Sequence, residues 1–240
     1  IETLISESYR TEIALKDVQF RSLQAQINPH FLYNTLESMN WIAQLNDQEE
    51  ISTMVQALGA LLRASIDTRH KAISLEEEID LLDQYVSIQK VRYGERLQVT
   101  MEIPGECAGF GIPKLTLQPL VENSIKYGLE RFSSPCAITI SASCDRDSLV
   151  VKVIDDGPGM EREFVAAILR GEVEPQGSGV GIVNIHERLR RLYGDGATLT
   201  IESERGKGTV VILRFPAITA STLMERIRKA HDGEATRNSR

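Results

Sequence analysis

The chain has 240 residues, of which 42% are hydrophobic, and 27 Lys and Arg residues stand against 34 Asp and Glu residues for a net charge of −7. That apolar fraction supports packed cores and excludes a wholly disordered chain. The acidic balance disfavours a nucleic-acid-binding surface, so we expect no nucleic-acid partner. Residues 1–95 hold 8 basic and 15 acidic residues, and this uneven distribution indicates two domains and a tail.

The cysteines and the longest uncharged run bear on where the protein works. Cys107, Cys136 and Cys144 fit neither a CxxC metal motif nor an even disulfide set, so we expect three ordinary thiols in a reducing compartment. The longest uncharged run, 22–36, is 15 residues long and contains Gln, Asn and His, so it cannot span a bilayer. The chain begins with Ile and shows no signal-peptide pattern, and we expect it to be part of a longer protein.

The first 95 residues predict helices, because no glycine precedes Gly59 and Pro29 is the single proline. Pro29 either begins a new helix capped by Asn28 or kinks one long helix, and the absence of a turn cluster before Asn28 favours the kink. A heptad-spaced apolar seam upstream is typical of a short coiled coil and comprises Ile13, Phe20, Leu23 and Ile27.

Two more helices are predicted before residue 95. Ser74 and Glu77 form a capping box that opens the later one, and Gly94 ends it. Amphipathic helices bury their apolar faces best against a second copy, so we expect an N-terminal helical hairpin that forms a four-helix bundle in a homodimer. The apolar face of the earlier helix comprises Ile51, Met54, Val55, Leu58, Leu61, Leu62 and Ile66.

Residues 96–216 predict strands and helices in mixed order, and hence an α/β sandwich with helices on one face of a sheet. Hairpins are expected at 145–147 and 206–208. Residues 217–240 lack strand character, and we expect a short helix over 223–230 and a loose end. The expected strands cover 97–103, 138–144, 149–154, 199–202 and 209–215, and the expected helices 115–128 (with Pro113 at its start), 161–170 and 180–193.

The first polar cluster lies in the segment 117–127. On a helix, Asn123, Lys126 and Tyr127 share one face at i, i+3 and i+4. An amide oxygen suits Mg²⁺ and an ammonium suits phosphate, while the adjacent Glu122 could orient or deprotonate a nearby group. Taken alone, the pattern also fits an ordinary solvated helix face.

The second cluster, Asp155-Asp156-Gly157-Pro158-Gly159, directly follows a predicted strand. A carboxylate at a strand end can accept a hydrogen bond from the exocyclic amine of adenine, and glycines let the backbone approach a flat ring. The alternative is a plain Asp–Gly turn.

The third cluster is Gly177-Ser178-Gly179-Val180-Gly181, which opens the predicted helix that carries Asn184. Free N–H groups at a helix N-terminus can bind phosphate. The spacing is not the dinucleotide fingerprint, and the chain has no P-loop motif. A flexible glycine linker is the alternative.

In their order and spacing, the three clusters and Gly206-Lys207-Gly208-Thr209 resemble the N, G1 and G2 boxes of the GHKL (Bergerat) ATPase superfamily. The segment 24–34 resembles the phosphoacceptor segment of LytS/YehU-type sensor histidine kinases, and 75–94 is also similar to that family. The resemblance covers roughly residues 20–216. It implies a helical dimerisation and phosphoacceptor domain (1–95), a GHKL-type ATP-binding domain (96–216) and a C-terminal tail (217–240).

The resemblance also implies individual roles. His30 would be phosphorylated, Asn123 would hold Mg²⁺, and Asp155 would take the adenine amine with help from Thr209 through water. Phe31 stands where many histidine kinases carry an acidic base, so the general base is unassigned, and Asn34 one turn on would orient the imidazole. Residues 160–176 would form a short helix and an ATP lid. Glu122 would act near the phosphates, and further nucleotide contacts would come from Lys126, Tyr127, Gly157, Gly159, Gly177, Gly179, Gly181 and Asn184.

The predicted function is that of a sensor histidine kinase in a two-component system. It would use ATP and Mg²⁺ to phosphorylate His30 and pass the phosphoryl group to an Asp of a response regulator receiver domain. We expect a homodimer that is the cytoplasmic portion of a bacterial inner-membrane protein, and we expect residues 96–216 alone to bind ATP as a monomer. The alternative is a GHKL ATPase that acts as a conformational clamp without phosphohistidine, which the segment 20–34 disfavours.

Overall fold

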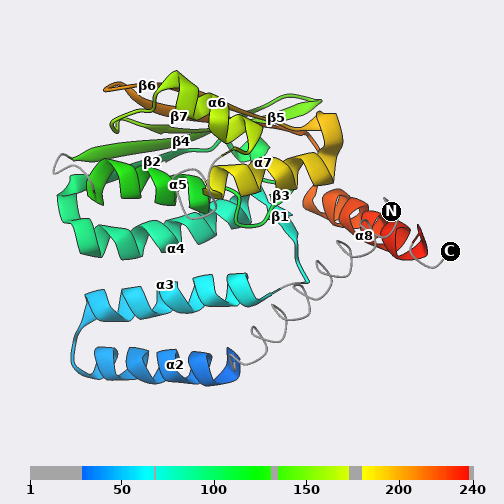
Figure 1. Ribbon diagram of the computed structural model, residues 1–240. Helices are drawn as coiled ribbons and strands as arrows, with labels where there is room; N and C mark the ends of the chain where they lie inside the picture. Colours follow the sequence, from blue (N-terminus) through cyan, green and yellow to red (C-terminus); the bar gives the residue numbers. More distant parts are fainter. Residues whose placement is uncertain (1–28, 68, 131–134, 173–179, 238–240) are drawn as a thin grey trace, which may run out of the picture. The chain divides into compact units, whose positions relative to one another are not determined.

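The computed structural model describes residues 29–67, 69–130, 135–172 and 180–237 (Figure 1). Contacts group the chain into two units, Ile1–Gly59 and Ala60–Arg240, and each is described by itself. The expected boundary lay after residue 95. The grouping differs because β1 (Ala72–Ser74) and α4 (Leu75–Tyr93) pack within the second unit. The heptad seam lies outside the described residues and comprises Ile13, Phe20, Leu23 and Ile27.

The first unit contains α2 (Pro29–Leu45) and most of α3 (Glu49–Ile66). The Asn40 Oδ1 atom accepts hydrogen bonds from Ser52 Oγ at 2.7 Å and from Gln56 Nε2 at 3.2 Å, which joins the two helices. The predicted helical hairpin is therefore confirmed. Within the described residues α2 begins at Pro29, and the choice between a kinked helix and a new one depends on residues outside them.

The second unit is built on a five-stranded sheet in the order β2-β4-β5-β7-β6. Strands β2 and β4 run parallel, and the other neighbours are antiparallel. Alternate side chains, such as Val151 and Val153, are buried on one face, as the period of two demands. The strands are β2 (Leu97–Glu102), β4 (Cys136–Cys144), β5 (Ser148–Asp155), β6 (Thr198–Glu204) and β7 (Gly208–Pro216).

Helices α5 (Gln118–Ile125) and α7 (Val180–Tyr193) lie along one side of this sheet, with α4 next to α5 (Figure 1). The expected α/β sandwich is confirmed, and α6 (Arg162–Arg170) and α7 match their predicted ranges. Helix α4 opens with the predicted Ser74–Glu77 capping box and ends at Gly94, whose φ is 57°. Short 3-10 turns cover Gly94–Arg96 (η1), Gly105–Cys107 (η2) and Gly194–Gly196 (η4).

The segment before α5 departs from expectation. Pro113 does not start a helix but ends β3 (Gly111–Pro113), which pairs antiparallel with β1. The helix expected over 115–128 begins only at Gln118, and it continues as a π-helix over Lys126–Glu130 (η3). Two three-residue strands carry too little periodicity to be recognised locally, and only their pairing reveals them.

The expected loose tail is packed in its first half. Helix α8 (Ala220–Arg237) is longer than the predicted 223–230 and contacts both β1 and β3. Leu223 is fully buried, and the Ala72 N–H donates to Met224 Sδ at 3.3 Å. The small β1–β3 sheet thus has a covering helix that sequence analysis left unplaced.

The expectation of three free thiols is wrong. Cys107 and Cys144 form a disulfide across 37 residues of sequence, and Cys136 remains a buried thiol. No spacing motif marks this pair. The fold brings the η2 turn beside the end of β4, and that proximity decides the pairing.

Candidate functional site

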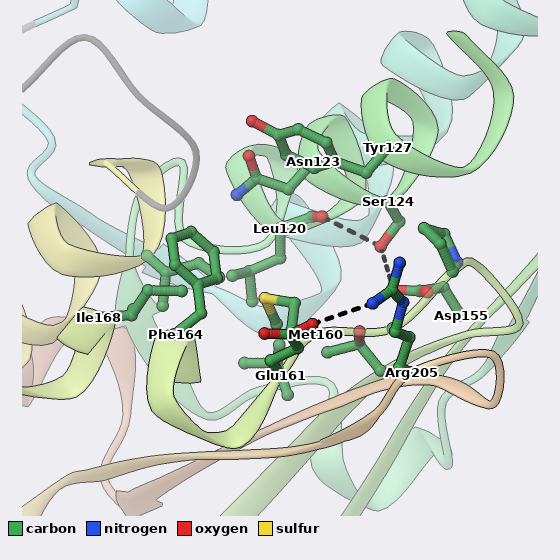
Figure 2. A pocket seen from close by; sticks show the side chains of 15 residues that line it. Leu120, Asn123, Ser124, Tyr127, Asp155, Met160, Glu161, Phe164, Ile168 and Arg205 are labelled. Carbon is green, nitrogen blue, oxygen red and sulfur yellow. Dashed lines mark hydrogen bonds and ion pairs between the residues drawn. The ribbon is translucent and has the colours of Figure 1, made fainter. Parts of the chain in front are cut away.

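A cavity of about 480 Å³ opens between α5, the end of β5, α6 and the β6–β7 hairpin. This volume is in the range of small-molecule sites. Figure 2 shows Asn123, Ser124 and Tyr127 on one side of it and Met160, Glu161 and Arg205 on the other. Of the predicted site residues, the cavity brings together Asn123, Tyr127, Asp155, Gly159 and Thr209.

Asp155 is the last residue of β5, and both of its carboxylate oxygens are held. Ser124 Oγ donates to Oδ2 at 2.9 Å (Figure 2), and the Gly157 N–H donates to Oδ1 at 3.0 Å. Burial raises the pKa of Asp155 above its usual value, while these two hydrogen bonds offset part of the rise. The result is an oriented hydrogen-bond acceptor at the edge of the cavity. Sequence analysis missed Ser124, although it lies directly after Asn123.

Glycines allow the segment after Asp155 to pack closely against the β6–β7 hairpin. Gly159 has a φ of 66° and passes so close to the Glu204 carbonyl that a Cβ would collide with it. Gly208, at φ 92°, meets the Asp155 carbonyl in the same way. The Gly206 N–H donates to the Pro158 carbonyl at 2.7 Å. Gly159 therefore allows close backbone-to-backbone packing at a position that also lines the cavity.

Asn123 is half-buried on α5, and its Nδ2 atom is buried without a hydrogen-bond partner among the described residues. Gly181, at the start of α7, approaches the same amide: a Cβ at that position would lie 3.4 Å from Nδ2. A buried polar atom without a partner is costly unless a ligand or solvent satisfies it. The amide beside the cavity thus fits a polar ligand such as a phosphate or a hydrated cation.

Several predicted residues do not line the cavity. Glu122 on α5 and Lys126 at the start of η3 are both exposed, and Gln118 Nε2 donates to Glu122 Oε1 at 2.8 Å. The Lys126 ammonium lies over the Tyr127 ring, 5.4 Å from its centroid, outside the residues that line the cavity. Asn184 is exposed on α7. Gly157 lies beside the cavity, and Gly177 and Gly179 lie outside the described residues.

Asp156, the neighbour of Asp155, does not line the cavity either. Its Oδ1 atom accepts from the Ala137 N–H at 2.8 Å, and its own N–H donates to the Ala137 carbonyl at 3.2 Å. Asp156 thus extends the pairing of β4 and β5 by one residue, a role that an asparagine could share.

The apolar wall of the cavity went unrecognised in the sequence. Phe164 and Ile168 come from α6 and Ile182 from α7 (Figure 2). Their helical spacing predicts only a buried face, because core and ligand wall produce the same pattern. Arg205 closes one edge by donating to Glu161 Oε1 at 3.0 Å, although both side chains are largely exposed. An apolar slot with the Asp155 carboxylate at its edge, and with Glu161 paired to Arg205, suits a flat, amine-bearing ring.

His30 and Asn34 belong to the first unit, whereas the cavity belongs to the second. His30 is exposed near the start of α2. Asn34 lies one turn further, with its Nδ2 atom 3.4 Å from His30 Nδ1. The predicted phosphoacceptor is therefore accessible on a helix surface, and an amide stands beside its ring.

A mixed sheet layered with helices, and a cavity between α5, α6 and the β6–β7 hairpin, define a GHKL-type ATPase domain. Residues 112–219 match the family model "Histidine kinase-, DNA gyrase B-, and HSP90-like ATPase", and residues 18–97 match the family model "Histidine kinase". The ATPase match implies that ATP is used. The histidine kinase match disfavours the alternative of a conformational clamp.

The chain is similar over most of its length to curated sensor histidine kinases. It is 43% identical to sensor histidine kinase YesM of Bacillus subtilis (strain 168) over 216 residues. These residues cover 90% of this chain and 36% of the relative. It is 34% identical to sensor protein kinase HptS of Staphylococcus aureus (strain USA300) over 218 residues. These residues cover 90% of this chain and 41% of the relative. The chain thus spans about two fifths or less of these relatives' length.

A solved structure is also similar. The catalytic domain of histidine kinase ThkA is 22% identical, with a TM-score of 0.48, and the match covers 61% of this chain and 97% of that one. Within the described ranges, no helix combines the length and the apolar character needed to cross a membrane.

Proposed function

We propose that the chain is the catalytic portion of a two-component sensor histidine kinase. It binds ATP in the cavity of the second unit, phosphorylates His30, and donates the phosphoryl group to an Asp of a response regulator receiver domain. The pairing of an exposed histidine with an ATPase-type cavity in one chain carries the proposal. Since this chain spans about two fifths or less of relatives named as sensor kinases, we propose that it works together with a membrane sensor region.

The cavity supports an assignment of the two ends of the nucleotide. The Asp155 carboxylate accepts from the adenine amine, and Phe164 and Ile168 pack against the ring. Thr209 pairs with Asp155 across β5 and β7, and it assists adenine recognition through a bridging water. The Asn123 amide, whose Nδ2 has no partner in the described structure, lies where a Mg²⁺–phosphate group fits. When bound, Mg²⁺ supplies neutralisation of the phosphate charge.

Asn34 prepares His30 for nucleophilic attack. A half-turn of the Asn34 amide presents its Oδ1 atom to the Nδ1–H of the imidazole. That hydrogen bond keeps the proton on Nδ1, and it leaves the Nε2 lone pair free to attack the phosphoryl group. Glu122, exposed beside Asn123 and hydrogen-bonded to Gln118, remains the candidate for proton transfer near the phosphates.

A second copy of the chain completes the assembly. The hairpin of α2 and α3 leaves large apolar side chains exposed: Phe31, Met39, Trp41, Ile42, Leu45, Ile51 and Leu58. An exposed apolar surface of this extent is unfavourable in water, by about 25 cal/mol per Å². Pairing two hairpins into a four-helix bundle buries it, so we propose a homodimer.

The His30→Gln variant tests the proposal. Gln cannot form a phosphoramidate, so the variant should incorporate no acid-labile phosphate from γ-labelled ATP. Its ATP affinity should stay within about twofold of the wild type, because His30 and the cavity belong to separate units. Filter assays after acid and alkali treatment, with nucleotide titrations, measure both quantities.

His70→Gln is the matched control, since His70 is also exposed but pairs with Asp67 at 2.6 Å. This control should keep its acid-labile label. Persistence of that label in His30→Gln would show that another residue accepts the phosphoryl group. A wild type that binds no ATP would remove the proposed function altogether.

A further inference from the structure

A buried carboxylate organises the loop that leads into α5. Glu78 lies on α4 and is only 1% exposed. Its Oε2 atom accepts from the Leu115 N–H at 2.8 Å, and its Oε1 atom accepts from the N–H groups of Thr116 at 2.6 Å and Leu117 at 2.8 Å. Three consecutive backbone donors of the loop 114–117 thus converge on one side chain.

These donors lie at the N-terminus of α5. The helix begins at Gln118, its N-cap position is Leu117, and no side chain of its own caps it. A helix start needs acceptors for its first N–H groups and favours a negative charge there. From a different helix, Glu78 supplies an acceptor for the N–H of the N-cap residue Leu117 and a carboxylate at this end of α5. It therefore determines where α5 begins, and with that the position of Asn123 one and a half turns further on.

The carbonyl side of the same loop is held by Arg188 on α7. Its guanidinium donates to the Lys114 carbonyl at 2.8 Å, to the Leu115 carbonyl at 3.0 Å and to Thr116 Oγ1 at 2.8 Å. Leu115 has a φ of 56°, a left-handed conformation that is unfavourable for a non-glycine residue and persists only when its surroundings hold it. Side chains of α4 and α7 therefore both form hydrogen bonds to the four-residue loop that leads into α5.

Helix α7 is also the element that approaches Asn123, through Gly181. We propose that Glu78 is a positioning residue for the phosphate end of the nucleotide site. By capping α5 against α7, it sets Asn123 in register with the start of α7. Glu78 lies in the segment that matches the histidine kinase family model, and the loop lies in the ATPase segment. The first segment thus shapes the site of the second. This inference rests on the proposed nucleotide site.

Three backbone N–H donors on its two oxygens fit an ionised Glu78 carboxylate, although the net effect of its surroundings is to raise its pKa. Burial raises the pKa of Glu78, whereas the three backbone N–H groups and the charge of Arg188 lower it. Thr116 and Leu117 are fully buried, so loss of the carboxylate would leave their N–H groups without water as a substitute. The loop therefore depends on this side chain for its conformation.

The test measures binding of β,γ-methylene ATP, which avoids turnover, to the 1–240 chain by calorimetry. The ratio of the dissociation constant in EDTA to that in Mg²⁺ defines the magnesium factor. In Glu78→Gln one amide hydrogen faces a backbone N–H, so α5 loses its cap and Asn123 shifts. We expect the magnesium factor to fall roughly tenfold. The dissociation constant in EDTA should change less than about threefold, because β5 and β7 hold Asp155 and the Gly157 N–H still fixes one of its oxygens if α5 moves Ser124.

Two neighbours on α4 serve as controls. Glu76→Gln removes an exposed charge, and Glu77→Ala breaks the capping box of α4, which lowers stability without touching the loop 114–117. Both should keep the wild-type magnesium factor. An unchanged factor in Glu78→Gln, or an equal fall in Glu77→Ala, would overturn the positioning role. A wild type whose ATP binding does not respond to Mg²⁺ would instead overturn the proposed site itself.

Arg188→Lys covers the case in which Glu78→Gln does not fold. A lysine keeps the positive charge but cannot bond the Lys114 carbonyl, the Leu115 carbonyl and Thr116 Oγ1 together. We expect a folded protein, shown by a cooperative melting curve, whose magnesium factor is roughly threefold lower. A wild-type factor in this folded variant would also overturn the proposal.

Discussion

At the scale of single residues, the site depends on how Asp155 is held. The Ser124 and Gly157 donors fix both carboxylate oxygens, and the apolar surroundings strengthen any hydrogen bond made to them. Asp155 could be singled out in the sequence because it follows a strand and precedes glycines. Ser124 could not, since a serine on a helix has no pattern that distinguishes a ligand-orienting hydroxyl from a solvated one.

The Asp155→Asn variant should lose adenine recognition and keep its fold. An asparagine can still bond Gly157 and Ser124, but it then presents an amide N–H₂ to the adenine amine. Losing a charge-assisted bond should weaken ATP binding roughly ten- to hundredfold. GTP binding, which does not use that amine, should change little. Competition titrations with both nucleotides measure this, and equal wild-type affinities for ATP and GTP would contradict the role.

The same residue predicts how ATP affinity depends on pH. Binding needs the carboxylate, and burial raises the pKa of Asp155 above the ordinary 3.8. Affinity is therefore full above the raised pKa and is lost as the pH falls through it, earlier on acidification than for an exposed aspartate. The Asp155→Asn variant should lack this acid limb.

At the scale of elements, α8 illustrates what local reasoning leaves out. The segment 217–240 has a helical pattern but no sign of where it docks. In the structure it covers the β1–β3 sheet, and Gly111 passes so close to Ala220 that a Cβ at Gly111 would lie 2.6 Å from its Cα. The delayed start of α5 has the same origin, because β1, which pairs with the strand that Pro113 ends, and Glu78 both lie more than thirty residues before Pro113 in the chain.

The Leu223→Ala variant tests the docking of α8. Leu223 is fully buried, so its truncation should lower the free energy of unfolding by about 2–5 kcal/mol. Glu225→Ala, at an exposed position of the same helix, should change it by about 0.5 kcal/mol or less. Urea unfolding of the two variants measures the difference. Equal values would mean that α8 does not pack on the sheet in solution.

At the scale of the whole molecule, the folding unit is larger than residues 96–216. Leu75, Leu82 and Val86 of α4 belong to the same core as the sheet, and each is at most 1% exposed. Burying each such side chain contributes about 1.5–3 kcal/mol. Our expectation that residues 96–216 alone bind ATP therefore needs revision, since that fragment lacks α4, the Glu78 cap and α8.

A fragment of residues 70–240 should unfold cooperatively, bind ATP and be monomeric. A fragment of residues 96–216 should melt without a sharp transition, and it should bind ATP at least tenfold more weakly than the 70–240 fragment. The 1–240 chain should be a dimer, because it alone contains the exposed apolar surface of α2 and α3. Thermal unfolding, nucleotide titration and light scattering compare the three. A cooperative, ATP-binding 96–216 fragment would restore the earlier boundary.

Local pattern alone determined much of this protein. The helices α3, α4, α6 and α7, the two hairpins, and the candidates Asp155 and Asn123 all follow from periodicity, caps, glycines and side-chain chemistry, which act over a few residues. Only the tertiary structure decided the pairing of Cys107 with Cys144, the apolar wall around Phe164, and the hydrogen bonds of Glu78 and Arg188 to the loop 114–117. These features depend on contacts between segments that lie tens of residues apart in the sequence. Such contacts stabilise the fold, but they produce no pattern within a short stretch of sequence.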